Sequence, residues 1–287
     1  IDHGALRHNA AAVRKAVGDK PGLIAVVKAD GYGHSGPEVA QTLAPFAAQF
    51  GVATLHEARA VRAVVPDKDL LILSPCLPEE REAAVREGFI PVVSSTAEAK
   101  AYAHLSQGKP ARIHLCIDTG MGRIGVWQDE ALKTAQEIAA VEGLEIESIS
   151  THLPVADSDP DFTAEELRGW ETLVAQLRAI FPTAKFHALN SAGSLQRPEH
   201  AADRVRPGLA LYGISPLPGF AKLLRPVMTL KTRITLVRDV GPGRGISYGR
   251  DFITAQPMRV ATLAMGYADG YPRQTSNQGA QVLIRGK

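Results

Sequence analysis

The sequence predicts a parallel (β/α)8 TIM-like barrel over residues 1–220, followed by the start of a predominantly β domain over residues 221–287. Eight short, continuously apolar runs alternate with segments whose apolar residues recur at spacings of three and four. The first pattern is typical of buried parallel strands and the second of amphipathic helices. Near Leu224 the alternation stops and no helical pattern follows. A doubly wound open sheet is the alternative for the first part.

The expected strands of the barrel follow one another at regular intervals. They are residues 23–28, 50–55, 70–75, 90–95, 111–118, 144–152, 185–191 and 203–213. Helical patterns lie at 4–18, 37–48, 56–65, 78–88, 96–105, 129–141 and 163–181. Because a barrel of this kind places its active site at the carboxyl ends of the strands, the residues that end these runs are the first candidates for chemistry.

The last part of the chain has the pattern of a half-buried sheet. "VMTLKTRITLVRDV" alternates apolar and polar residues, and "MRVATLAMG" and "QVLIRG" are two further strand-like runs after a glycine-rich connection. We expect the domain boundary between Leu217 and Pro226. The chain begins at Ile1 and stops at Lys287 just after a strand-like run, so we expect it to be a piece of a longer protein.

Composition excludes several classes of partner. The 287 residues are 45% apolar and 22% charged, and 32 basic residues against 30 acidic ones leave a net charge of +2 with no basic run. Nucleic acid and membranes are therefore poor candidates, and we expect no metal site. Cys76 and Cys116 interrupt or follow apolar runs, which favours buried free thiols in a reducing cytoplasm.

The ends of the expected strands carry a ring of polar residues that is unusual for a core. They are Lys28, Tyr32, Asp118, Arg123, His152, Asn190, Ser191, Arg206 and Gly208. A lysine at a buried strand end is either an ion-pair partner or an amine whose pKa falls on desolvation, so that it can form a Schiff base. "NSAG" and "RPGLALYG" at the seventh and eighth strands match the usual phosphate site of a barrel. A lysine, an arginine and a phosphate site together favour pyridoxal phosphate.

The same segments resemble a known family. "AVVKADGYGH", "DTGMGRIG", "STHLPVADSD", "LNSAG", "VRPGLALYG", "ISYGRDF" and "LAMGYADGYPR" are similar, in this order, to motifs of bacterial alanine racemases. The resemblance covers nearly the whole chain. It implies a pyridoxal-phosphate enzyme that interconverts L- and D-alanine for peptidoglycan, works as a head-to-tail homodimer and has a β domain that continues past Lys287.

The resemblance also implies a role for each matching residue. Lys28 would hold the cofactor covalently and act as one base, and Tyr267 would be the second base, in the partner subunit's site. Two bases on opposite faces of the substrate suffice for racemisation. His152 and Arg206 would be the cations that help the Tyr267 phenol to ionise. Tyr248 and Asp157 match positions near the family's entrance corridor.

The remaining implied roles concern the cofactor and the substrate. Arg206 would face the pyridine nitrogen, and Arg123 would contact the phenolic oxygen and orient the substrate carboxylate. The residues implied to bind the cofactor are Lys28, Tyr32, Arg123, His152, Asn190, Ser191, Arg206, Gly208 and Leu209, with Tyr32, Ser191, Gly208 and Leu209 at the phosphate.

One position departs from the family pattern. Cys116 stands where many members have a carbamylated lysine, whose anion faces the arginine that corresponds to Arg123. A neutral thiol supplies no such charge, and a buried thiolate would be costly. Our hypothesis is that a bound anion such as chloride, or another carboxylate, compensates Arg123.

Several alternatives are kept beside this interpretation. The same machinery could act on another small amino acid such as serine, the chain could be a non-catalytic cofactor carrier, or it could be a decarboxylase. Carriers are single-domain barrels, so the β domain argues against the second. For Asp30, His34 and Asp118 we favour a role in their own turns over catalysis.

Overall fold

The protein is described from a computed structural model, for residues 1–106 and 108–286. The chain divides into two compact units, Ile1–Met228 and Thr229–Lys287, which are described separately.

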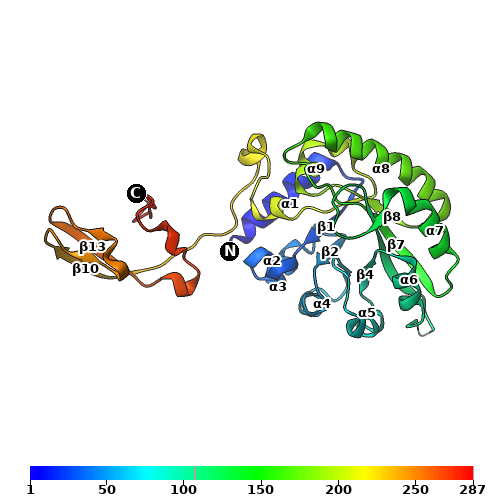
Figure 1. The fold of residues 1–287 in the computed structure, drawn as a ribbon, viewed down its shortest axis with the longest axis horizontal. Coiled ribbons are helices and arrows are strands. Elements are labelled where there is room, and N and C mark those ends of the chain that lie inside the picture. Colours follow the sequence, from blue (N-terminus) through cyan, green and yellow to red (C-terminus); the bar gives the residue numbers. More distant parts are fainter. Residues whose placement is uncertain (107, 287) are drawn as a thin grey trace. The chain divides into compact units, whose positions relative to one another are not determined.

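The first unit is a nearly closed parallel barrel (Figure 1). Its strands are β1 (Gly22–Val26), β2 (Gln49–Val52), β3 (Asp69–Ile72), β4 (Ile90–Val93), β5 (Ala111–Asp118), β7 (Leu144–Ser150), β8 (Lys185–His187) and β9 (Arg204–Val205). They run side by side in the order β8-β7-β5-β4-β3-β2-β1-β9, each pair parallel. Backbone bonds from Asp203 to Phe186 (3.0 Å) and from Arg206 to Leu189 (2.8 Å) join β9 to the β8 side. The predicted barrel is confirmed and the open sheet is excluded.

Several strands end earlier than predicted. β1 ends at Val26, before Lys28, and the last predicted strand, 203–213, is a two-residue strand followed by the 3-10 helix η4 (Leu209–Tyr212). The apolar runs continue because the residues beyond the strand ends remain buried in the top of the barrel. A short extra strand, β6 (Val126–Trp127), pairs with the end of β5.

Helices surround the sheet (Figure 1). They are α1 (His3–Val17), α2 (Lys28–Gly33), α3 (Gly36–Leu43), α4 (Leu55–Arg62), α5 (Arg81–Arg86), α6 (Thr96–Ala103), α7 (Ala131–Ala139), α8 (Pro160–Ile180) and α9 (Ser191–Gln196). Side chains of Asp2, Thr54, Ser95, Asp159 and Asn190 cap five of them, as expected for residues whose oxygen accepts a free N–H of the first turn. Apolar faces of the helices pack on the strands in one continuous core.

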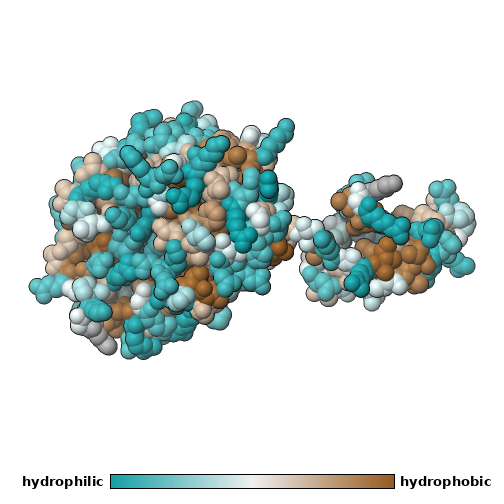
Figure 2. Space-filling model, turned by 180° about the vertical axis from the view of Figure 1, so that it is seen from behind, coloured by the Kyte–Doolittle hydropathy of each residue, from teal (hydrophilic) through white to brown (hydrophobic). Residues whose placement is uncertain are grey.

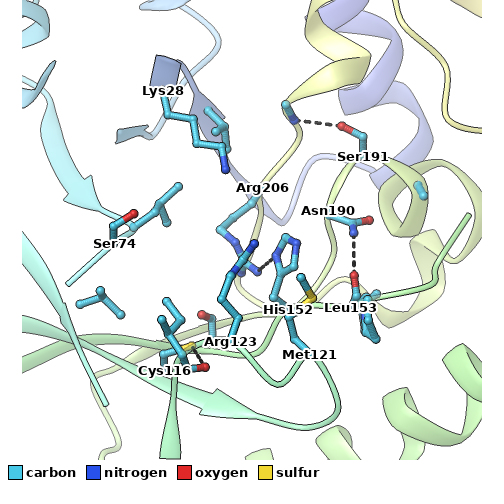
Figure 3. Close-up of a pocket in the computed structure, with 18 of the residues that line it drawn as sticks. Lys28, Ser74, Cys116, Met121, Arg123, His152, Leu153, Asn190, Ser191 and Arg206 are labelled. Carbon is cyan, nitrogen blue, oxygen red and sulfur yellow. Dashed lines mark hydrogen bonds between the residues drawn. The ribbon is translucent and has the colours of Figure 1, made fainter. Parts of the chain in front are cut away.

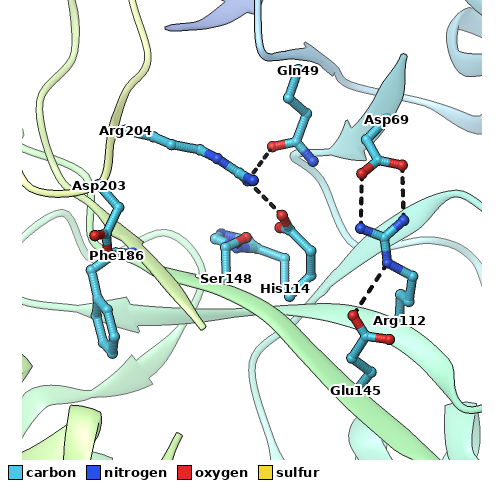
Figure 4. A network of polar contacts seen from close by, with 10 residues as sticks. Gln49, Asp69, Arg112, His114, Glu145, Ser148, Phe186, Asp203 and Arg204 are labelled. Carbon is cyan, nitrogen blue, oxygen red and sulfur yellow. Dashed lines mark hydrogen bonds and ion pairs between the residues drawn. The ribbon is translucent and has the colours of Figure 1, made fainter. Parts of the chain in front are cut away.

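Ion pairs close the amino ends of the strands (Figure 4). Arg112 makes a bidentate contact with Asp69, both distances 2.8 Å. Arg204 bonds to Gln49 at 2.8 Å and to the buried Glu147 at 2.6 Å. These groups lie at the end of the barrel opposite to the predicted site. Residues at the amino ends of barrel strands commonly serve stability.

The second unit holds two small antiparallel sheets. β10 (Ile234–Val240) pairs with β13 (Met258–Leu263), and β11 (Gly245–Ile246) pairs with β12 (Phe252–Ile253). The strand predicted for "QVLIRG" is wrong, because residues 281–286 form no strand and Val282, Leu283 and Ile284 are exposed. Figure 2 shows the apolar surface of this unit. Among the described residues, no helix is both long and apolar enough to cross a membrane.

Candidate active site

The carboxyl ends of the barrel strands surround one pocket of about 410 Å³ (Figure 3), a size suited to a small ligand or cofactor. Its lining includes every predicted site residue of the first unit: Lys28, Tyr32, Arg123, His152, Asn190, Ser191, Arg206, Gly208 and Leu209. These residues come from five different strand ends, those of β1, β5, β7, β8 and β9, so the barrel topology alone brings them together.

Lys28 stands at the start of an unusual turn. Residues 29–32 all have left-handed backbone angles, with φ between 51° and 63°. For residues other than glycine this conformation costs roughly 1–2 kcal/mol each, and Ala29, Asp30 and Tyr32 adopt it. Side chains hold the turn, because Glu57 accepts the Ala29 N–H at 2.8 Å and Asp30 accepts the N–H of Gly36, the first residue of α3, at 2.7 Å. The predicted turn role of Asp30 is confirmed.

The surroundings of Lys28 favour its neutral amine. Burial lowers the pKa of Lys28, and the positive charges of Arg123 and Arg206 lower it further, against an opposing effect of Glu57. In Figure 3 the amine points into the same space as the guanidinium of Arg123. A lower pKa leaves a larger fraction of the amine neutral, and the neutral amine is the form that acts as a nucleophile or base.

Arg206 is a buried residue of the pocket wall. It donates to the Thr151 carbonyl at 2.6 Å, to the His187 carbonyl at 3.1 Å and to Nδ1 of His187. Burial lowers the pKa of Arg206 to about 10, so the guanidinium remains charged at neutral pH. His187 stacks on His114 with 5.0 Å between ring centroids.

His152 differs from the expectation. Burial and the charges of Arg206, Arg123 and Lys28 lower its pKa to about 3. His152 is therefore neutral at neutral pH, and of the two cations that the resemblance offered for Tyr267, only Arg206 carries a charge.

A small cradle occupies the β8–β9 side of the pocket. The hydroxyl of Ser191 accepts the N–H groups of Gly208 at 2.9 Å and of Ala210 at 3.1 Å. A Cβ atom on Gly208 would lie 2.6 Å from the Tyr32 hydroxyl, so glycine alone lets the two segments approach. Burial raises the pKa of Tyr32, which keeps its hydroxyl as a proton donor. A backbone this close to a neutral hydroxyl, in a pocket that the cationic side chains of Arg123 and Arg206 also line, fits a bound phosphate.

Asp118 shapes the turn that carries Arg123. Its carboxylate accepts the N–H groups of Gly120 at 2.9 Å, Gly122 at 3.1 Å and Arg123 at 3.1 Å, so its predicted turn role is confirmed. Cys116 lies beside the turn, with its sulfur 3.7 Å from the Ile124 carbonyl. Burial raises the pKa of Cys116 to about 11, so the thiol is neutral at neutral pH.

Tyr267 and Tyr248 belong to the second unit, where they are 63% and 76% exposed. The pocket itself also contains residues that sequence reasoning missed, among them Met121 and Leu153. A methionine between the two glycines of "DTGMGR" was the available signal, since an apolar side chain in a polar strand-end turn is out of place there.

A parallel barrel with an activated lysine at the end of β1, two arginines and a phosphate cradle defines a class: a barrel enzyme that carries its cofactor on a lysine. Comparison with known proteins identifies the family within this class. The family model described as alanine racemase, N-terminal domain, matches residues 1–216, and that for the alanine racemase C-terminal domain matches residues 227–287. The chain belongs to the alanine racemase family.

Individual relatives agree with the family models. The alanine racemase of Symbiobacterium thermophilum is 39% identical over 295 residues, covering 100% of this chain and 78% of that protein. The solved alanine racemase of Clostridium difficile 630 has a TM-score of 0.89 and 30% identity, over 95% of this chain and 74% of that one. An alanine racemase from Bartonella henselae with covalently bound pyridoxal phosphate has a TM-score of 0.84 and 29% identity, over 96% and 76% of the two chains. These findings support alanine racemisation over the serine, carrier and decarboxylase alternatives.

Proposed function

We propose that this protein is a pyridoxal-phosphate-dependent alanine racemase in which Lys28 and Tyr267 are the two bases. The observation that carries the proposal is the Lys28 amine, which faces Arg123 and Arg206 across a pocket with a phosphate cradle. D-alanine made here would supply peptidoglycan. Two buried free thiols fit a cytoplasmic location.

The described residues fit the cofactor. Lys28 would hold it covalently, and the Tyr32 and Ser191 hydroxyls with the backbone of Gly208 and Leu209 would bind its phosphate. Arg206 would face the ring nitrogen and Arg123 the phenolic oxygen, while His152 and Asn190 complete the wall. When bound, pyridoxal phosphate delocalises the electrons that remain at the substrate α-carbon after the proton leaves.

The charge of Arg206 would affect how strongly the bound cofactor delocalises these electrons. A guanidinium that stays protonated cannot accept a proton or a hydrogen bond. It can only donate hydrogen bonds. Arg206 is held by carbonyl and imidazole acceptors in a buried site, and facing the ring nitrogen it would disfavour protonation of that nitrogen. With its ring nitrogen unprotonated, the cofactor would supply a weaker electron sink, which suits racemisation better than transamination.

Protons move through two side chains. The lowered pKa of Lys28 leaves a larger fraction of neutral amine at Nζ, which can take the α-proton from one face of alanine. The Tyr267 hydroxyl acts on the other face, and we propose that it comes from the second subunit of a head-to-tail homodimer. Arg123 would orient the substrate carboxylate between them.

The first test locates the cofactor and the reaction. Protein reconstituted with pyridoxal phosphate and reduced with borohydride should show the added mass on the peptide that contains Lys28. L-alanine in deuterated water should gain deuterium at the α-carbon and lose optical rotation without releasing carbon dioxide. Added mass without exchange would indicate a carrier, and carbon dioxide would indicate a decarboxylase.

The second test concerns Tyr267. Tyr267→Phe should slow proton removal from one enantiomer by about 10²–10⁴-fold, the usual contribution of a positioned acid or base, and affect the other enantiomer far less. Tyr271→Phe, in the same "GYADGY" segment, is the matched control and should be close to wild type. Equal losses for both enantiomers in a folded Tyr267→Phe protein would contradict the two-base assignment.

A mixing experiment tests whether the site is shared. Lys28→Ala and Tyr267→Phe proteins, each with strongly reduced racemisation alone, should recover activity when their subunits are exchanged, because one site of each mixed dimer then has both groups. Random pairing in a two-fold dimer restores at most about a quarter of the sites. Absence of any recovery, with mixed dimers demonstrated by native mass spectrometry, would place both bases in one chain.

A further inference from the structure

A buried carboxyl lies behind the turn that carries Arg123. Glu166 of α8 is 6% exposed; its Oε1 accepts the Thr119 hydroxyl at 2.5 Å, and its enclosed Oε2 has no partner among the described residues. Among the described residues, no basic side chain forms an ion pair with Glu166. Burial, with the charge of Asp118, raises the pKa of Glu166 against the effect of the Thr119 bond. Burying a carboxyl with an oxygen that has no hydrogen-bond partner costs folding stability, so the presence of Glu166 here needs an explanation.

The Thr119 hydroxyl joins two segments of the pocket wall. It lies 2.6 Å from the Thr151 hydroxyl as well as against Glu166. A hydroxyl has one proton to give, so when Thr119 donates to an ionised Glu166, Thr151 donates to Thr119. The backbone carbonyl of Thr151 in turn accepts Nη2 of Arg206 at 2.6 Å. One carboxyl therefore anchors a chain of contacts that reaches the buried arginine.

The arginine turn also rests directly on α8. A Cβ atom on Gly120 would lie 3.1 Å from the Phe162 ring and 3.7 Å from Oε1 of Glu166. Asp118 fixes the turn internally through its three amide contacts. Those contacts do not attach the turn to the barrel wall, whereas the Glu166–Thr119 bond does.

We propose that Glu166 is a positioning residue of the alanine site, which through the Thr119 hydroxyl holds the Arg123 turn and the Thr151 carbonyl in register. Glu166 is not among the residues that line the pocket, so it acts through Arg123 and Arg206. The inference rests on the proposed function, in which Arg123 orients the substrate carboxylate.

The test compares three variants. Glu166→Leu removes the acceptor, Glu166→Gln keeps an oxygen at Oε1, and Glu165→Leu on the exposed side of α8 is the control. Glu166→Leu should raise KM for L-alanine about tenfold or more with a smaller change in kcat, since a misplaced orienting group can cost up to about a hundredfold. Its Kd for pyridoxal phosphate should change less. Glu166→Gln should recover most of the affinity for alanine.

Two further measurements separate positioning from general stability. Amide hydrogen exchange of residues 120–123 should be faster in Glu166→Leu than in Glu165→Leu, with the rest of the barrel unchanged. Thr119→Val should reproduce the KM effect, and the double variant should not add to it, because both remove one contact. If Glu166→Leu folds with the KM and exchange of the control, or if Glu166→Gln is as poor as Glu166→Leu, the proposal is wrong.

The exchange measurement also keeps the two proposals apart. If wild-type protein does not racemise alanine, the proposed function fails. The exchange rates of residues 120–123 would still decide whether Glu166 holds the turn.

Discussion

Replacing Gly208 with alanine tests the phosphate cradle at its narrowest point. The new Cβ atom would lie 2.6 Å from the Tyr32 hydroxyl and 3.2 Å from Cζ of the same ring. The φ of Gly208 is −119°, outside the left-handed region that favours glycine, so the expected effect is argued from the contact between the new Cβ atom and the Tyr32 ring. Tyr32 packs on Tyr212 with 5.0 Å between ring centroids, and Tyr212 is held by a 3.0 Å bond to the Val26 carbonyl. The ring therefore has little room to retreat.

The size of the effect follows from that distance. The hydroxyl must move by about 0.8 Å to reach an ordinary contact of 3.4 Å with the new Cβ. A hydrogen bond of about 2.7 Å lengthened by that much is lost. A bond to a charged group is worth about 1.5–3 kcal/mol, so the Kd for pyridoxal phosphate should rise about ten- to a hundredfold.

The assay is a fluorescence titration of apo protein with pyridoxal phosphate. Gly219→Ala is the matched control, because its Cβ would meet nothing within 4 Å, and it should bind like wild type. Tyr32→Phe should weaken binding by a similar amount, and Gly208→Ala should cost much less in that background. A folded Gly208→Ala protein with wild-type Kd would refute the reasoning that Tyr32 and Gly208 together contact the phosphate.

Three other predictions concern the arginine turn and the buried His114. Asp118→Asn should raise KM for alanine and speed amide exchange in the turn, because an amide group cannot accept all three N–H groups that the carboxylate accepts; unchanged values would refute this. Chloride should raise activity above gluconate at equal ionic strength, since the neutral Cys116 thiol supplies no anion to Arg123; equal activity would exclude a chloride at this site. Burial lowers the pKa of His114 to about 3, whereas an unfolded histidine has a pKa of about 6.5. As the pH falls, the unfolded state therefore binds the proton before the folded state does. The contribution of His114 to the free energy of unfolding is complete above pH 6.5 and is lost as the pH falls towards 3. In a His114→Asn protein, the urea midpoint of unfolding should change less with pH than in the wild type.

Much of the fold could be predicted because burial in a parallel barrel produces long apolar runs in the sequence itself. The residues at which strands end were predicted less accurately from the sequence. Val27 is as buried as Val26, although only Val26 lies in β1, and hydropathy cannot separate a buried turn from a buried strand. The run "QVLIRG" has strand composition, but residues 281–286 pair with no strand. Strand formation depends on a partner, which local composition does not reveal.

Site residues at strand ends were predictable for a similar reason. Lys28, Arg123 and Arg206 interrupt apolar or glycine-rich patterns, and a barrel gathers all strand ends at one edge. Glu166 gave no such signal, since on a helix with exposed charges it looks like its neighbour Glu165. Only the packing of α8 against the turn at Gly120 distinguishes the two.

The order of apolar and polar residues by itself determined the barrel, the class of the site and the residues that reach it, because periodicity and strand-end chemistry are local properties. The tertiary structure decided the protonation states. Lys28, His152 and Cys116 have shifted pKa values because barrel packing buries them and, for Lys28 and His152, brings them near the arginines. Desolvation and charge proximity arise between segments far apart in the chain, so they exist only once the strands have closed around the pocket.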